Sequence, residues 1–183
     1  HGLTVVESRR TCMPESAQDI VLLPDAGPLI TLAYAQALDL LFKPGWRVAV
    51  VDMVLNEVTR NQTHTSQKLA AWAAQDRVQV LPTQTLAAHL KLARRQAHLG
   101  ELAIQETMNQ FALQNPPQKA VLLFEDHAIA RNSFFVPPSC QKISTRAFLI
   151  FLEQKGWIES AAAIERQAIQ MGRQFSQLHF PPA

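Results

Sequence analysis

The stretch Ile20-Val21-Leu22-Leu23-Pro24-Asp25-Ala26-Gly27-Pro28-Leu29 predicts a buried strand that leads directly into a helix. Its first part, residues 20–25, is a short apolar run that ends in Pro-Asp, of the kind found in strands covered on both faces. Asp25 suits the N-cap position of the following helix, and Pro28 suits the first helical turn. A strand followed at once by a helix is the unit from which parallel α/β sheets are built.

The same alternation continues through the rest of the chain. Further strands are expected at 46–50, 78–82, 120–125 and 140–143. Further helices are expected at 35–42, after Asp52, and at 66–75, 84–96, 101–113, 144–155 and 158–173. The run at 78–82 alternates apolar and polar residues and ends at a proline, which suits an edge strand. The pattern predicts an α/β fold with three layers, α/β/α, and a parallel sheet of four to five strands.

Composition limits the class of protein. The chain has 183 residues, of which 48% are hydrophobic and 17% are charged, as expected for one globular domain. We place that domain at residues 19–175. The net charge of +2 is too small to indicate nucleic acid by itself. Because every apolar run is far shorter than the roughly 20 residues of a membrane span, no membrane association is expected.

The two ends of the chain are set apart from the fold. Residues 1–18 are polar, lack the apolar run of a signal peptide, and begin with His1 in place of Met. We treat them as an N-terminal extension, either a tag remnant or a trimmed start, and treat 176–183 as a C-terminal tail. The two cysteines, Cys12 and Cys140, form no motif, which favours a reducing compartment and a cytoplasmic protein.

Four acidic residues stand at the ends of apolar runs or early in the helices that follow: Asp25, Glu57, Glu101 and Asp126. In a parallel sheet these positions meet in one crevice at the carboxyl ends of the strands. Carboxylates gathered there repel one another and remain ionised together only with a cation among them. We therefore expect a divalent metal ion, and metals held by carboxylates commonly act on phosphates.

Four motifs contain these acids: Asp25-Ala26-Gly27-Pro28-Leu29-Ile30, Val54-Leu55-Asn56-Glu57-Val58, Gly100-Glu101-Leu102-Ala103-Ile104 and Glu125-Asp126-His127-Ala128-Ile129-Ala130-Arg131. Their order and spacing resemble those of PIN domains, in particular the compact bacterial PIN proteins of toxin–antitoxin type. The later segments Ile143–Leu149 and Gly156–Ile158 are similar to the closing part of that group. The resemblance covers roughly residues 20–160.

PIN domains are ribonucleases that depend on Mg²⁺ or Mn²⁺, so the resemblance implies a metal-dependent endoribonuclease. It implies that all four acids are catalytic and that Asp25, Asp126 and, directly or through a water, Glu101 hold the metal. Glu57 would hold a water on the metal or position the nucleophile. Many relatives have two Asp residues in the late motif, where this chain has Glu125-Asp126. We assign Asp126 because Arg131 lies five residues downstream, but a shift by one residue would make Glu125 the ligand.

The resemblance also implies partners and substrate contacts. Partners of this group are RNA, an antitoxin protein and a second copy of the chain. Thr145 matches a small hydroxyl residue near the site of related proteins. Arg94 and Arg95 stand in a basic cluster before Glu101, which either grips an RNA backbone or forms a solvated helix face. Arg131 either binds phosphate or pairs with a carboxylate.

Other interpretations remain open. Each acid could act only as a helix cap or as a charge favoured by the helix dipole. Asp52 is expected to be such a cap, and Glu106 is expected to point to another helix face. A non-enzymatic module that binds RNA or a partner without turnover is the main alternative function. A phosphohydrolase of the haloacid dehalogenase type is disfavoured because it needs a second Asp where this chain has Gly27.

Overall fold

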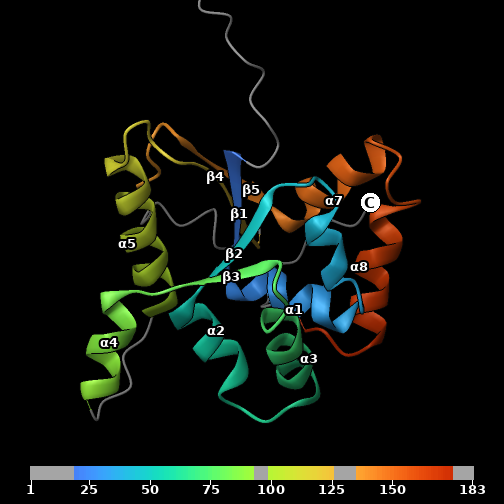
Figure 1. Cartoon of the computed structure of the whole chain (residues 1–183). Helices are drawn as coiled ribbons and strands as arrows, with labels where there is room; N and C mark the ends of the chain where they lie inside the picture. Colours follow the sequence, from blue (N-terminus) through green and yellow to red (C-terminus); the bar gives the residue numbers. More distant parts are fainter. Residues whose placement is uncertain (1–18, 93–98, 126–134, 175–183) are drawn as a thin grey trace, which may run out of the picture.

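The computed structural model of the chain describes residues 19–92, 99–125 and 135–174 (Figure 1). Within these ranges, one parallel sheet has five strands in the order β3-β2-β1-β4-β5. The strands are β1 (Ile20–Pro24), β2 (Arg47–Val51), β3 (Val78–Leu81), β4 (Lys119–Phe124) and β5 (Cys140–Ser144). The prediction of a parallel sheet of four to five strands is thus confirmed, with β3 at one edge.

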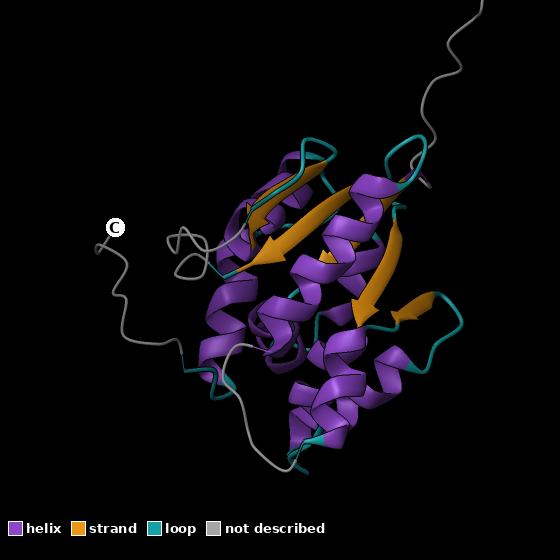
Figure 2. Ribbon diagram, turned by 90° about the vertical axis from the view of Figure 1, so that its left-hand side faces the viewer, coloured by secondary structure: helices purple, strands orange, loops and turns teal. Residues whose placement is uncertain are grey.

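Helices follow the strands and cover both faces of the sheet. They are α1 (Ala26–Tyr34), the 3-10 helix η2 (Leu38–Phe42), α2 (Asp52–Thr59), α3 (His64–Ala73), α4 (Gln84–Lys91), α5 (Leu99–Leu113), α7 (Thr145–Gln154) and α8 (Ala161–Gln170). In Figure 1, α5 lies on one side of the sheet and α7 and α8 lie on the other. Figure 2 shows the strands running in one direction with helices on both sides. The three-layer α/β/α prediction is therefore confirmed.

Local capping explains where the helix boundaries differ from the predicted ones. The helix expected at 66–75 begins at His64, because the side chains of Thr63 and Ser66 form a capping box. The helix expected from 158 begins at Ala161, because the side chain of Ser160 accepts a hydrogen bond from the backbone N–H of Ala163. These boundaries depend on one or two hydroxyl groups and not on the apolar pattern.

The core of the sheet consists of the apolar runs that the sequence singles out. Leu22 and Leu23 of β1, Val50 and Val51 of β2, and Leu122 of β4 have no exposed surface. The chain passes outward from β1 through β2 to β3, and then crosses to the other side of β1 to form β4. In open α/β sheets, a ligand crevice forms where the strand order reverses in this way, at the carboxyl ends of the strands.

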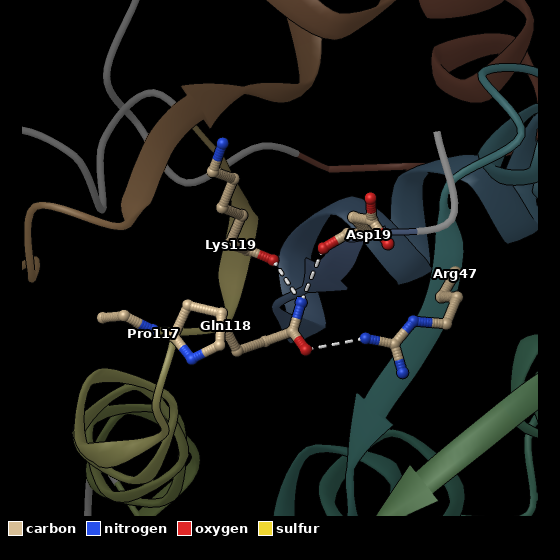
Figure 3. Close-up of a pocket in the computed structure, with 6 residues that line it drawn as sticks. Asp19, Arg47, Pro117, Gln118 and Lys119 are labelled. Atoms are coloured by element: carbon tan, nitrogen blue, oxygen red, sulfur yellow. Dashed lines mark hydrogen bonds between the residues drawn. The ribbon is translucent and has the colours of Figure 1, made fainter. Parts of the chain in front are cut away.

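At the amino ends of the strands, one glutamine makes hydrogen bonds to three neighbouring residues. The Nε2 of Gln118 donates to the carbonyl oxygens of Asp19 (2.8 Å) and Lys119 (2.9 Å), and its Oε1 accepts from Nη2 of Arg47 at 2.7 Å (Figure 3). These residues, with the preceding prolines, line an open cavity of about 280 Å³. Because they stand at the amino ends of β1, β2 and β4, this cavity is remote from the predicted acidic site.

Two further expectations concern the class of protein. Across the described ranges, no helix combines the length and the apolar character needed to cross a membrane. Cys140 is a buried free thiol, whereas Cys12 lies outside the described residues, as do the predicted extension at 1–18 and the tail at 176–183.

Candidate active site

Asp25 lies at the reversal of strand order, directly after β1. Its Oδ1 accepts a hydrogen bond from the N–H of Ala26 at 2.8 Å, so it caps α1, and its own N–H donates to the carbonyl oxygen of Leu123 at 2.9 Å. Burial raises the pKa of Asp25 to about 6, against the opposing hydrogen bond from Ala26, and repulsion from Glu57, Glu101 and Glu125 adds to the rise. A capping role and a place in an acidic group are therefore both present at this residue.

Glu57 and Glu101 approach Asp25 from two different helices. Glu57, on α2, accepts a hydrogen bond at Oε1 from the N–H of Gly100 at 2.9 Å, in the first turn of α5. Burial raises the pKa of Glu57, the bond from Gly100 lowers it, and Glu101 contributes repulsion. A Cβ at position 100 would lie 2.6 Å from Oε2 of Glu57, so only glycine leaves room for this contact.

Glu125, directly after β4, is the third carboxylate whose repulsion acts on Asp25. It is only 8% exposed, and its Oε1 accepts a hydrogen bond from the hydroxyl of Thr31 at 2.7 Å. Its Cγ fills the space that a Cβ on Gly27 would need. The sequence-based preference was for Asp126, which lies outside the described residues. The alternative residue, Glu125, lies close enough to Asp25 to repel it, and the choice between the two acids stays a prediction.

The predicted substrate contacts are only partly described. Thr145 begins α7, is 4% exposed, and donates its hydroxyl to the carbonyl oxygen of Phe124 at 3.3 Å, one residue before Glu125. This hydroxyl therefore stabilises the end of β4 next to the acidic group. Arg94, Arg95 and Arg131 lie outside the described residues.

Two other acids have structural roles at α4. Asp52 was expected to cap its own helix, but Val51 is the N-cap of α2 and makes no side-chain cap bond. Asp52 instead accepts hydrogen bonds from the N–H (2.9 Å) and the hydroxyl (2.6 Å) of Thr83, because α4 begins beside it. Glu106 accepts from the N–H groups of Gln84 (2.8 Å) and Thr85 (3.0 Å), so its carboxylate caps the start of α4.

The sequence gives no indication of two residues that support Glu125. Thr31 is 1% exposed and lies on α1, and Arg173 follows α8 and donates from Nε to the Thr31 hydroxyl at 3.0 Å. The separation of 142 residues between them leaves no local pattern to read. By contrast, Gly27 and Gly100, which leave space for Glu125 and Glu57, stand inside the acidic motifs and are therefore visible in the sequence.

The donor set is chemically suited to a hard divalent cation, since it consists of carboxylate oxygens alone. In the part of the chain that the structure describes, however, no three Asp, Glu, His or Cys side chains converge closely enough to hold a metal ion. The acids thus lie within range of mutual repulsion but not within one coordination shell. No protein-family model matches the sequence, and a comparison with curated proteins finds no significant match.

Proposed function

We propose that this protein is a metal-dependent endoribonuclease that hydrolyses RNA phosphodiester bonds at the acids around Asp25. The observation that carries the proposal is the raised pKa of Asp25, to which burial and three carboxylates from separate elements contribute. Burial next to like charges destabilises the ionised form of Asp25, and perturbed groups of this kind concentrate at functional sites. A helix cap alone would need only one of these acids.

A bound Mg²⁺ or Mn²⁺ would reverse the sign of the interactions in this group. Asp25 and Glu101 would hold it together with the acid after β4, either Glu125 or Asp126. When bound, such an ion activates water and neutralises charge on phosphate oxygens. Glu57, fixed at Oε1 by Gly100, would keep its position and orient the attacking water. Because no three described acids converge, the side chains must move closer together on binding.

The resemblance to PIN domains extends the proposal from phosphate chemistry to RNA. In this proposal the protein acts as a toxin that an antitoxin protein restrains, forms a homodimer, and works in the cytoplasm. Thr145, Arg94, Arg95 and Arg131 remain the candidate substrate contacts. Of these, Thr145 lies next to the acidic group, since its hydroxyl bonds the residue that precedes Glu125.

The alternative is a module that binds RNA or a partner without turnover. The observation that favours it is the lack of convergence among three described acids, which an enzyme with a preformed metal site would show. The two functions differ in one measurable property, the cleavage of RNA. Only the nuclease cleaves RNA, and it does so only when the metal ion is present.

The test is cleavage of single-stranded and structured RNAs with Mn²⁺, with and without EDTA. The variant Asp25→Asn removes the central charge but keeps an oxygen that can accept from Ala26. Asp76→Asn is the matched control, because it makes the same chemical change at an exposed acid. We expect wild type and Asp76→Asn to cleave RNA, and expect EDTA or Asp25→Asn to abolish cleavage. RNA binding without cleavage by the wild type would favour the binding module.

A further inference from the structure

A chain of two hydrogen bonds connects the end of α8 to the candidate site. The Nε of Arg173 donates to the Thr31 hydroxyl at 3.0 Å, and that hydroxyl donates to Oε1 of Glu125 at 2.7 Å. Thr31 is 1% exposed and Glu125 is 8% exposed, so water has little access to the contact between them, whereas the contact of Arg173 with Thr31 is partly buried. Three segments that are distant in sequence therefore meet behind the acidic group.

The chemistry of the donors fixes the direction of this chain. A guanidinium group has donors and no acceptor, so Arg173 can only donate to the oxygen of Thr31. The single hydroxyl proton of Thr31 is then directed to Glu125, whose carboxylate accepts it. Arg173 in this way makes Thr31 an obligatory donor, so the position of the Glu125 carboxylate depends on Arg173 through the Thr31 hydroxyl.

A glycine stands at each end of this series of hydrogen bonds and allows its local geometry. Gly27 and Thr31 are four residues apart on α1 and so lie on one face of the helix. The missing side chain at Gly27 leaves the space that Cγ of Glu125 fills. At the other end, Gly172 has a φ of 109°, a conformation that favours glycine, and Arg173 follows with its N–H bonded to the carbonyl oxygen of Ala168 at 2.9 Å. The turn after α8 thus returns Arg173 toward α1.

The charges agree with this arrangement. Burial lowers the pKa of Arg173, and the negative charge of Glu125 opposes that effect. Even a partly buried cation is costly unless it has partners, and Arg173 has the Thr31 hydroxyl and the nearby charge of Glu125. Arg173 also donates from Nη1 to the carbonyl oxygen of Gln174 at 3.0 Å. Partners are thus present along the guanidinium group.

We propose that Arg173 is a positioning residue of the candidate site, which acts through Thr31 to hold the Glu125 carboxylate beside Asp25. Its effect on turnover rests on the proposed nuclease function, whereas its effect on Glu125 does not. The segment after α8, which carries no acid of the site and none of the recognised motifs, is then part of the functional unit.

The test uses the full chain with two pairs of variants. Arg173→Met removes the donor, and Arg166→Met is its control, because Arg166 is an exposed arginine of α8. Thr31→Val removes the hydroxyl, and Thr31→Ser keeps it. Two quantities are measured at fixed pH: the Glu125 carboxyl resonance in protein labelled with ¹³C-glutamate, and kcat and KM for RNA cleavage with Mn²⁺.

We expect Arg173→Met and Thr31→Val to move the Glu125 resonance and to lower kcat by about 10- to 100-fold with little change in KM, since misplacement of a catalytic group has effects of this size. Arg166→Met and Thr31→Ser should resemble wild type. An unmoved Glu125 resonance in folded Arg173→Met protein overturns the inference. A moved resonance in proteins that never cleave RNA, wild type included, supports the positioning role and overturns only the nuclease function.

If Arg173→Met does not fold, Arg173→Lys is used in its place to test the positioning role of Arg173. Lysine keeps a positive charge and a donor but lacks the planar fork of arginine. We expect it to shift the Glu125 resonance less than Thr31→Val does and to keep more activity. A Glu125 resonance identical in Arg173→Lys, Thr31→Val and wild type would contradict the inference.

Discussion

The Glu57 carboxylate accepts a hydrogen bond from the N–H of Gly100 at 2.9 Å, which joins α2 to the first turn of α5. The contact places a negative charge at a helix N-terminus, where the helix dipole favours it. It also fixes Glu57 beside Glu101, which follows Gly100 in the chain. This one hydrogen bond therefore stabilises the N-terminus of α5 and also fixes the position of Glu57, a candidate catalytic acid.

Gly100→Ala is expected to separate these two roles. The added Cβ would lie 2.6 Å from Oε2 of Glu57, at the far end of a flexible side chain, so Glu57 should swing away and lose its bond. Alanine favours the helix over glycine by about 1 kcal/mol, which offsets a lost hydrogen bond of about 1–2 kcal/mol. We therefore expect nearly unchanged stability in urea denaturation but a cleavage rate as low as that of Glu57→Gln. Wild-type activity in Gly100→Ala would show that Glu57 has no catalytic role.

Gly27→Ala is expected to cost more stability than Gly100→Ala. Here the added Cβ meets Cγ and Cβ of Glu125, which are close to the backbone and cannot swing aside. Overpacking of this kind typically costs about 1–3 kcal/mol. The double variant Gly27→Ala/Glu125→Ala should lose less stability than the sum of the single changes, because the clash is removed. Additive losses in the denaturation series would show that the two residues do not interact.

Asp25→Asn is expected to make the metal-free protein more stable than wild type at neutral pH, and the difference should grow as the pH rises from 4 to 6. The pKa of Asp25 is about 6 in the folded protein against 3.8 for the free side chain, so the folded state holds the extra proton between these values. The wild-type stability from this group therefore falls as pH increases from 4 to 6, by on the order of 3 kcal/mol. Asparagine has no charge to lose. We expect the two proteins to have similar Tm values at pH 4, and the variant to melt about 5 °C or more higher at pH 7.5.

The opposite order of Tm values at pH 7.5 would mean that Asp25 is stabilised as a carboxylate in the metal-free state. Asp76→Asn serves as the control, since this exposed residue should leave the pH dependence unchanged. Thermal denaturation must be followed with EDTA present, because a bound cation would stabilise the ionised acids and reverse the effect.

Glu106→Ala is expected to loosen α4 without affecting the site. Glu106 accepts the first N–H groups of α4, and none of the residues of α4 is buried. Loss of the cap should therefore allow local opening. Hydrogen exchange should show faster exchange of the amides at 84–91, while RNA cleavage stays within about twofold of wild type, as for surface changes away from a site. A large loss of cleavage would assign Glu106 to the catalytic group.

Most of the fold could be predicted because apolar runs and helical periodicity report burial directly. The run at 20–24 and the acid that follows it gave β1 and the N-cap of α1, and the run at 120–125 gave β4. The order of the strands in the sheet could not be read in this way, because pairing depends on contacts between distant segments. The starts of α3 at His64 and of α8 at Ala161 depended on the capping residues Thr63 and Ser160, which the apolar pattern does not report.

The candidate site was predictable only where its residues stand next to the strands. Asp25, Glu57 and Glu101 could be named as candidates because each acid stands in a recognisable place relative to a strand or a glycine. The choice between Glu125 and Asp126 could not be made, since a strand end is uncertain by one residue from pattern alone. Arg173 reaches the site by a turn after α8, and the partner of Asp52 proved to be Thr83, so both were set by tertiary packing.

Calorimetric titration of Mn²⁺ into the metal-free protein at pH 7.5 tests most directly whether the acids around Asp25 form a cation site. We predict that wild type and Asp76→Asn bind Mn²⁺ with a Kd below about 1 mM, as carboxylate sites for divalent cations do. Asp25→Asn should bind at least about tenfold more weakly, a difference of about 1.4 kcal/mol. Equal binding by wild type and Asp25→Asn, or no binding by either at millimolar Mn²⁺, would contradict a metal site at these acids.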